Sequence, residues 1–228
     1  MNNLSNTYVI GDVHGCLFTL KQLIAKLPKD AKLIFVGDLI DKGNFSKEVV
    51  SFVMNAGFQC ILGNHESLML EHIEGVLFNG ETAKWSTKKH FGGYKTIGDY
   101  KDDTNTLKKH IAWMKTLPRY IEIDKFFITH AFALPYYKRR DSSDVHVGLM
   151  SNRPSDFEEW GWDWEDGYED YDVINIYGHA VVDEVNLSCN HVGIDTGCVY
   201  GKNLTALSLD TMSVYTQVVD VRDIEIRG

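Results

Sequence analysis

The stretch TYVIGDVHG (residues 7–15) is a short apolar run that ends in a glycine and continues directly into an aspartate and a histidine. The next stretch, CLFTLKQLIAKL (16–27), has apolar residues at helical spacing and stops before Pro28. Two further strand–helix pairs follow, with strands at 32–37 and 58–63 and helices at 46–57 and 65–77. Strands that alternate with helices in this way predict an α/β fold with parallel strands.

The rest of the chain is less regular. Residues 79–120 are mostly helical and polar in pattern, with FGGYKTIGDY (91–100) as an expected interruption. Ser46 and Gly57 are the expected N-cap and C-cap of the second helix. Strands are expected at 125–131, 173–180, 191–197, 204–210 and 213–219. Residues 136–172 lack clear periodicity, so we expect a single domain over 1–228 with a lid or insertion around 136–172.

Composition places the chain among ordinary globular proteins. Its 228 residues are 44% hydrophobic and 24% charged, which allows a sizeable core. The segment after Met1 lacks the features of a signal peptide, and no apolar run approaches the ~20 residues that cross a bilayer. The four cysteines, Cys16, Cys60, Cys189 and Cys198, form no CxxC motif. We therefore expect a cytoplasmic protein with reduced thiols and no membrane partner.

The net charge of −9 is concentrated in one segment. Residues 156–172 contain nine acidic residues and no Lys or Arg, which leaves the remainder of the chain balanced. Without a basic stripe, the chain is a poor candidate for binding long nucleic acid. The aromatic residues of this segment are Trp160, Trp162, Trp164, Tyr168 and Tyr171. They could stack on an adenine or shape a peptide-binding groove. Alternatively, the segment is a solvent-exposed loop whose aromatic side chains pack against the core.

Residues that bind metals recur where the expected strands end. The side chains of this kind that follow strands are Asp12, His14, Asp38, Asn64, His65, His130 and His179. Ligand sites of open α/β sheets form at the carboxyl ends of strands, so these side chains are expected at one edge. A Gly-Asp turn is common, but turn formation alone does not require several imidazoles. Burying carboxylates and imidazoles together requires compensation, and mixed Asp, Asn and His ligands suit Mn, Fe or Zn.

Five motifs in this order resemble those of the calcineurin-like metallophosphoesterases, specifically the phosphoprotein phosphatase branch with its small phage and bacterial members. They are GDVHG (11–15), GDLIDKG (37–43), GNHE (63–66), THA (129–131) and GHA (178–180), and IDTGCVYGKNLTAL (194–207) extends the match. The resemblance implies a four-layer β-sandwich flanked by helices. It also implies a dinuclear metal site at one sheet edge.

The resemblance further implies a role for each site residue. The ligands of two divalent ions, most simply Mn with Fe or Zn as alternatives, would be Asp12, His14, Asp38, Asn64, His130 and His179, with Asp38 bridging. His65 would be the general acid, oriented by Asp41. Arg153 and Asn64 would contact the phosphate. Attack would come in line from a metal-bridging hydroxide.

Two functions are consistent with these motifs. The first is a metal-dependent phosphomonoesterase that acts on phosphoserine or phosphothreonine, and in principle phosphotyrosine, in proteins or on small phosphate esters. The second is a symmetrical diadenosine tetraphosphate hydrolase. Asp41, Glu66 and the short chain favour the first, whereas Leu62 and Cys198 favour the second. A cyclic nucleotide phosphodiesterase is a more distant alternative.

Three positions depart from the family pattern. Leu62 stands where many members have a phosphate-binding arginine, and Arg139 and Arg140 are candidates to compensate for it. Lys42 and Asn44 replace the usual arginine and proline of the second motif, and we expect little catalytic consequence from either.

Overall fold

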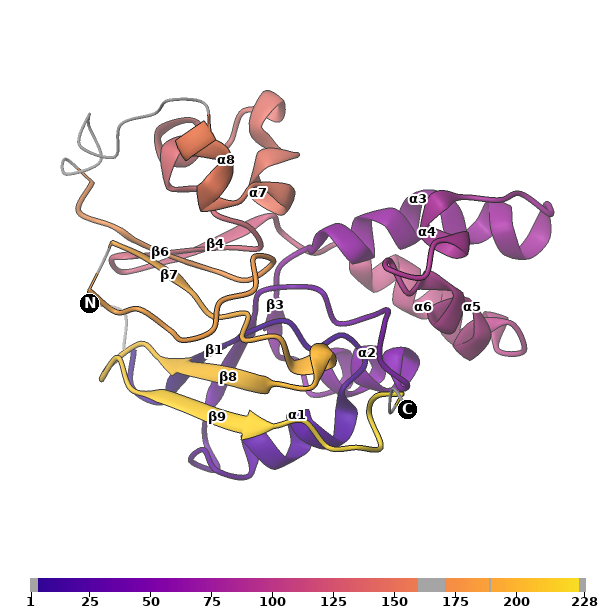
Figure 1. Cartoon of the computed structure of the whole chain (residues 1–228), viewed down its shortest axis with the longest axis horizontal. Coiled ribbons are helices and arrows are strands. Elements are labelled where there is room, and N and C mark those ends of the chain that lie inside the picture. Colours follow the sequence, from indigo (N-terminus) through magenta and orange to yellow (C-terminus); the bar gives the residue numbers. More distant parts are fainter. Residues whose placement is uncertain (1–3, 160–170, 189, 226–228) are drawn as a thin grey trace.

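The structure is a computed structural model that describes residues 4–159, 171–188 and 190–225. Two sheets form its centre (Figure 1). In spatial order, the first sheet contains β3 (Gln59–Cys60), β2 (Lys32–Phe35), β1 (Thr7–Ile10), β8 (Asn203–Ser208) and β9 (Val214–Val218). The second contains β4 (Tyr120–Ile123), β5 (Phe126–Thr129), β6 (Ile174–Tyr177) and β7 (His191–Gly193).

Helices fill the connections and flank both sheets. The α-helices are α1 (Leu17–Ile24), α2 (Ser46–Asn55), α3 (Asn64–Phe78), α4 (Lys84–Thr87), α5 (Gly93–Tyr100), α6 (Thr104–Met114), α7 (Gly148–Ser151) and α8 (Pro154–Glu159). Short 3-10 helices are η1 (Leu134–Arg139), η2 (Ser143–Val145) and η3 (Cys198–Tyr200). Among the helices of the described residues, none is both long enough and apolar enough to span a membrane.

Alternation along the strands produces four layers. Val9 of β1 faces the second sheet and packs in one cluster with Ile128 of β5. The next residue, Ile10, faces the opposite way and packs with Leu20 of α1. On the second sheet, Phe127 turns outward against the segment that contains η2 and α7. The order is therefore helix, sheet, sheet, helix, which confirms the fold class expected from the sequence.

Strand directions are mixed. The predicted parallel arrangement holds for β1, β2 and β3 and for β5, β6 and β7. β8 pairs antiparallel with β1, β9 pairs antiparallel with β8, and β4 pairs antiparallel with β5. Hairpins make antiparallel neighbours possible with short connections, whereas each parallel pair needs a crossover. The parallel arrangement expected from the first three strand–helix pairs is therefore confirmed, and antiparallel strands are added at one end of each sheet, β8 and β9 in the first and β4 in the second.

A helical lobe of α3–α6 extends from the sheets (Figure 1). Its interior is built around Trp85 and Tyr100, both almost fully buried. The expected interruption at 91–100 was wrong, because Gly93–Tyr100 forms α5. Gly93 lies against the Trp85 ring so closely that a Cβ would collide with it, so the glycine serves helix packing here.

Details of two other predictions also change. The N-cap of α2 is Phe45, and Ser46 is the first helical residue, whose hydroxyl accepts a hydrogen bond from the Asp41 amide at 3.0 Å. Gly57, with φ +68°, follows the C-cap Ala56. The region expected as a lid includes η1, η2, α7 and α8, while residues 160–170 lie outside the described part of the chain.

Asp223 fixes the start of α1 from the far end of the sequence. Its buried carboxylate accepts hydrogen bonds from the amides of Phe18 and Thr19, at 3.0 and 2.7 Å, and from the Thr19 hydroxyl at 2.6 Å. These are first-turn amides that lack partners within a helix. The carboxylate therefore ties α1, and the loop before it, to the C-terminal segment.

We expect Asp223→Ala to lower the free energy of unfolding by about 2–3 kcal/mol, because several buried donors lose their acceptor. Urea unfolding followed by circular dichroism measures the change. Asp183→Ala is the control, since that side chain is 92% exposed, and it should shift stability by less than about 0.5 kcal/mol. Equal stability of the two variants would contradict the role given to Asp223.

Candidate active site

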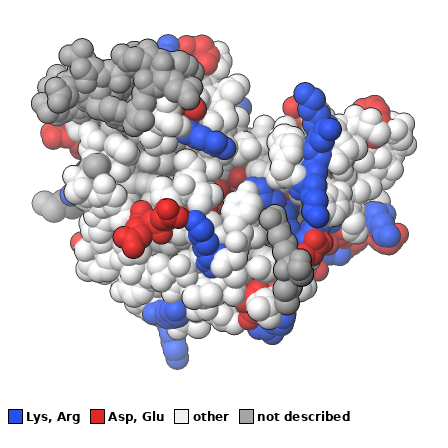
Figure 2. Space-filling model, viewed as in Figure 1, with Lys and Arg blue, Asp and Glu red and all other residues white. Residues whose placement is uncertain are grey.

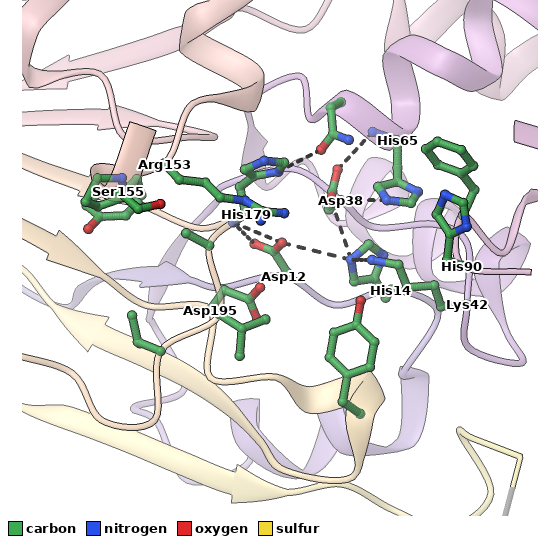
Figure 3. A pocket seen from close by; sticks show the side chains of 18 residues that line it. Asp12, His14, Asp38, Lys42, His65, His90, Arg153, Ser155, His179 and Asp195 are labelled. Atoms are coloured by element: carbon green, nitrogen blue, oxygen red, sulfur yellow. Dashed lines mark hydrogen bonds and ion pairs between the residues drawn. The ribbon is translucent and has the colours of Figure 1, made fainter. Parts of the chain in front are cut away.

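The carboxyl ends of both parallel strand sets meet at the same edge of the two sheets. Loops after β1, β2, β3, β5 and β6 converge there on a cavity of about 770 Å³. Figure 3 shows the side chains that point into it. Of the predicted site residues, those that line the cavity are Asp12, His14, Asp38, Asn64, His65, Arg153 and His179. His130 lies fully buried behind it, and Asp41 lies buried behind His65.

Backbone strain is concentrated at this edge. His14, Asp38, Asp41, Lys42 and His179 all have positive φ, between +45° and +71°. The left-handed region is uncommon for residues other than glycine, and such residues cluster at functional sites. The surrounding hydrogen bonds hold Asp38 in this conformation, because the Glu66 carboxylate accepts its amide at 2.8 Å.

Asp38 is the centre of the site. Its carboxylate oxygens lie 3.5 Å from His14 Nε2, 3.4 Å from His130 Nε2 and 3.9 Å from His65 Nε2. Burial by itself would raise the pKa of Asp38, but the neighbouring imidazoles and the Lys42 ammonium outweigh it and hold this pKa well below its usual range. The carboxylate therefore stays ionised and available as a ligand.

Two histidines are held by backbone carbonyls. Nδ1–H of His14 donates to the Ile40 carbonyl at 2.7 Å, and Nδ1–H of His130 donates to the Val36 carbonyl at 2.8 Å. Burial lowers the pKa of both imidazoles, and Lys42 lowers that of His14 further. Each ring is thus neutral with Nε2 turned toward the site. This is the usual preparation of a histidine that binds a metal.

Asn64 joins the second pair of histidines. Its Oδ1 lies 2.8 Å from His130 Nε2 and 3.1 Å from His179 Nδ1. The His179 amide donates to the Asp12 carboxylate at 3.1 Å, and Gly178 is required beside it because a Cβ would collide with that carboxylate. Residues from four strand ends therefore share one network.

The donor set fits divalent cations. Two groups of ligand atoms each lie within 4.8 Å of one another, one from His14, Asp38 and His65 and the other from Asp38, His130 and His179. The Lys42 ammonium lies 2.8 Å from His14 Nε2, so a positive charge already occupies the position that faces this ligand atom. Carboxylate, imidazole and amide donors without a thiolate suit Mn, Fe or Zn.

Asp195 is a site residue that the strand-end argument missed. It follows β7, lines the cavity and is 5% exposed. Burial raises the pKa of Asp195 to about 6, and burial together with Asp195 and Asp38 raises the pKa of Asp12. These buried carboxylates lack full compensation by positive charge, which a cation would supply. A weaker sequence signal was present, because HVGID also has an acid shortly after a strand that ends in glycine, here with Ile194 between them.

His65 is paired with Asp41. Its Nδ1–H donates to the Asp41 carboxylate at 2.6 Å, and the same carboxylate accepts from Trp85 Nε1–H at 2.6 Å and from the Thr96 hydroxyl at 2.5 Å. Burial would lower the pKa of His65, but the carboxylates of Asp38 and Asp41 outweigh it and raise this pKa. The arrangement is that of a histidine held ready to donate a proton from Nε2.

We expect Thr96→Val to lower the free energy of unfolding by about 1–3 kcal/mol, because the buried Asp41 carboxylate loses a donor. A less firmly held Asp41 should also reduce kcat about tenfold, since His65 loses its fixed orientation. Thr96→Ser keeps the hydroxyl and is the matched control. Thermal unfolding and steady-state kinetics measure the two effects, and an unchanged kcat in the valine variant would contradict them.

Of the basic residues named from the sequence, Lys42 and Arg153 line the cavity, whereas Arg139 and Arg140 do not. Lys42 contacts His14 in the site, and the expectation of little catalytic consequence from this position stays a prediction. Arg153 lines one end of the cavity with Ser155 (Figure 3). Arg139 and Arg140 pair with Asp144 and Glu122, each at 2.9 Å, away from the described cavity lining. They do not compensate for Leu62.

The acidic aromatic segment lies mostly outside the described residues. That includes Trp160, Trp162, Trp164 and Tyr168, so the two interpretations of these side chains stay predictions. Tyr171 is described: its ring packs against that of Tyr137, with centroids 5.8 Å apart, and Lys138 Nζ lies 4.7 Å from its centroid.

A four-layer fold with candidate Asp, His and Asn ligands at the strand ends is typical of the metallophosphoesterases. The model of the calcineurin-like phosphoesterase family matches residues 5–180, and the chain belongs to this family, whose members use divalent metal ions. It is a phosphoester-cleaving hydrolase by this membership.

Two relatives show the similarity over nearly the whole chain. The chain is 30% identical to the asymmetrical bis(5'-nucleosyl)-tetraphosphatase PrpE of Anoxybacillus flavithermus, over 90% of this chain and 92% of that protein. It is 28% identical to PrpE of Oceanobacillus iheyensis, over 87% and 86%.

Solved structures show the same fold. A proposed diadenosine tetraphosphatase superimposes with a TM-score of 0.67 at 19% identity, covering 94% of both chains. A serine/threonine phosphatase of Saccharomyces cerevisiae gives a TM-score of 0.60 at 12% identity, covering all of this chain and 83% of the other. Both classes that the motifs suggested therefore share this architecture.

Proposed function

We propose that this protein hydrolyses dinucleoside polyphosphates, with a bis(5'-nucleosyl) tetraphosphate as substrate. The observation that carries the proposal is the extent of the cavity, which runs from Arg153 and Ser155 past the ligand cluster to Lys42, His90 and Tyr200. A single phosphate needs only the central part. Cationic side chains on both sides of the cluster suit a chain of several phosphates. Similarity to tetraphosphatases over about nine-tenths of the chain supports the same substrate class.

Each residue has a proposed part in the reaction. Asp12, His14 and Asp38 would hold one divalent ion, and Asp38, Asn64, His130 and His179 the other. Bound ions supply charge neutralisation at the phosphoryl group and lower the pKa of a water molecule. Arg153 and Lys42 would neutralise further phosphate oxygens, and Asn64 would contact the phosphate. His65, held by Asp41, would donate its Nε2 proton to the departing oxygen.

A phosphomonoesterase acting on phosphoserine or phosphothreonine proteins is the second candidate. The observation that favours it is the His65–Asp41 pair, with a hydrogen bond of 2.6 Å. An alkoxide is a strong base and needs a proton donor to depart, whereas a polyphosphate departs more easily. A proton donor of this kind is therefore needed more for cleavage of a phosphate ester than for cleavage of a phosphoanhydride.

One assay separates the two candidates. Protein loaded with Mn is tested against diadenosine tetraphosphate, a phosphoserine peptide and p-nitrophenyl phosphate, and the products are resolved by chromatography. We expect kcat/KM to be highest for the tetraphosphate by more than tenfold. ATP with AMP as products would indicate asymmetrical cleavage, as in the named relatives, and two ADP would indicate symmetrical cleavage. A tenfold preference for the peptide would overturn the proposal.

A further inference from the structure

A second, smaller groove of about 120 Å³ opens beside the main cavity. It shares the lining residues Lys42, His90 and Tyr200 with the cavity, so the two hollows adjoin. Three segments line the rest of the groove. They are the segment that contains Lys89, helix α5 with Lys95, and the C-terminal segment at Glu225. No candidate metal ligand is among the described residues that line this groove.

The groove is basic. Among the described residues that line it, the ammonium groups of Lys42, Lys89 and Lys95 outnumber the single carboxylate of Glu225. Lys95 is fixed by Asn44 Oδ1 at 3.0 Å and by Glu225 at 3.1 Å, while Lys89 is exposed. Figure 2 shows Lys and Arg side chains gathered along the near side of the helical lobe, beside the hollow between that lobe and the sheets. In a protein with a net charge of −9, this local excess is selective for anions.

The position of His65 indicates on which side of the cavity the leaving group would depart. A general acid must lie on the side from which the leaving group departs. The His65 ring lies 6.5 Å from Phe91, which contacts His90 at 4.3 Å between ring centroids, and His90 lines the groove. Arg153 and Ser155 lie at the other end of the cavity (Figure 3). If His65 is the general acid of the proposed function, the leaving group would depart toward the lysines.

We propose that this groove, lined by Lys42, Lys89 and Lys95, binds the phosphate chain of a polyphosphate leaving group. The inference rests on the proposed function, because a phosphoprotein would present no phosphates there. Phosphates beyond the scissile one carry several negative charges, and each ammonium within reach lowers their free energy in the complex. The groove would thus select substrates by their leaving group, while the metal ligands act on the scissile phosphate.

Variants of the groove lysines test whether the groove binds polyphosphate. Lys89→Glu places a carboxylate in it, Lys95→Gln removes a second charge, and Lys88→Glu is the matched control, since Lys88 is exposed one residue away but lines neither the groove nor the cavity. The inhibition constants of tripolyphosphate and orthophosphate are measured against p-nitrophenyl phosphate hydrolysis, with free Mn held constant. The ratio of kcat/KM for diadenosine tetraphosphate to that for p-nitrophenyl phosphate is measured as well.

We expect Lys89→Glu to raise the inhibition constant of tripolyphosphate about tenfold relative to that of orthophosphate, and Lys95→Gln about threefold. The Lys88→Glu control should change it less than twofold, and the specificity ratio should fall in parallel with tripolyphosphate binding. The proposal would be overturned if the Lys88 and Lys89 variants changed the inhibition constant of tripolyphosphate equally, or if Lys89→Glu left it unchanged. If the wild type cleaves only the phosphopeptide, the proposed function fails, while the tripolyphosphate measurement still decides whether the groove binds polyphosphate.

Discussion

His65→Asn is expected to lower kcat for a phosphoserine peptide by about 10²–10⁴-fold, the range that a general acid contributes. The departing serine alkoxide is a strong base, and without the Nε2 proton it must leave unprotonated. For diadenosine tetraphosphate the loss should be smaller, about tenfold, because a polyphosphate leaving group needs less protonation. Steady-state kinetics on both substrates give the two values.

Metal content decides how that result is read. His65 lies with His14 and Asp38 in a cluster that could hold a cation, so it could be a ligand instead of an acid. We expect His65→Asn to retain its metal, measured by mass spectrometry of the purified protein at equal free Mn. Asp41→Asn is the companion variant, because it removes the charge partner at 2.6 Å and should reproduce part of the loss. Full turnover of the alkyl phosphate by His65→Asn would refute the acid role.

Asp38→Asn is expected to reduce kcat more than 10³-fold and to lower the number of bound divalent ions from two to fewer than one. Asp38 belongs to both clusters of candidate ligands, so its charge serves both ions. The asparagine oxygen can still accept the His65 amide, which the Asp38 carboxylate accepts at 3.0 Å, so the fold should be retained. Isothermal titration with Mn and thermal unfolding measure the two properties.

Single-cluster variants are the controls for this prediction. His14→Asn should weaken the binding of one ion and His179→Asn the binding of the other, because each histidine belongs to only one of the two clusters. A chelator should abolish the activity of the wild type, and added Mn should restore it. Loss of the same number of ions in all three variants, or activity that survives the chelator, would contradict a dinuclear centre bridged by Asp38.

The sequence predicted the parallel strands and the polar side chains that follow them because both depend on local patterns. A strand that ends in glycine and is followed by Asp or His can be read from a few adjacent residues, as in GDVHG (11–15). The fold then brings such strand ends to one edge whatever the intervening loops contain. That is why the strand ends alone could name Asp12, His14, Asp38, Asn64, His65, His130 and His179 together. The role of six of them as metal ligands came from the family resemblance and stays a prediction.

The tertiary structure alone decided the features that depend on contacts between distant residues. β8 pairs antiparallel with β1 from the far end of the chain, and an apolar run carries no sign of its direction. Lys42 reaches His14, and Trp85 and Thr96 hold Asp41, across separations of 28, 44 and 55 residues. The lysine groove likewise joins segments around residues 42, 89, 95 and 225. Local sequence determines which side chains follow each strand, whereas packing of the helical lobe determines which charges lie beside them.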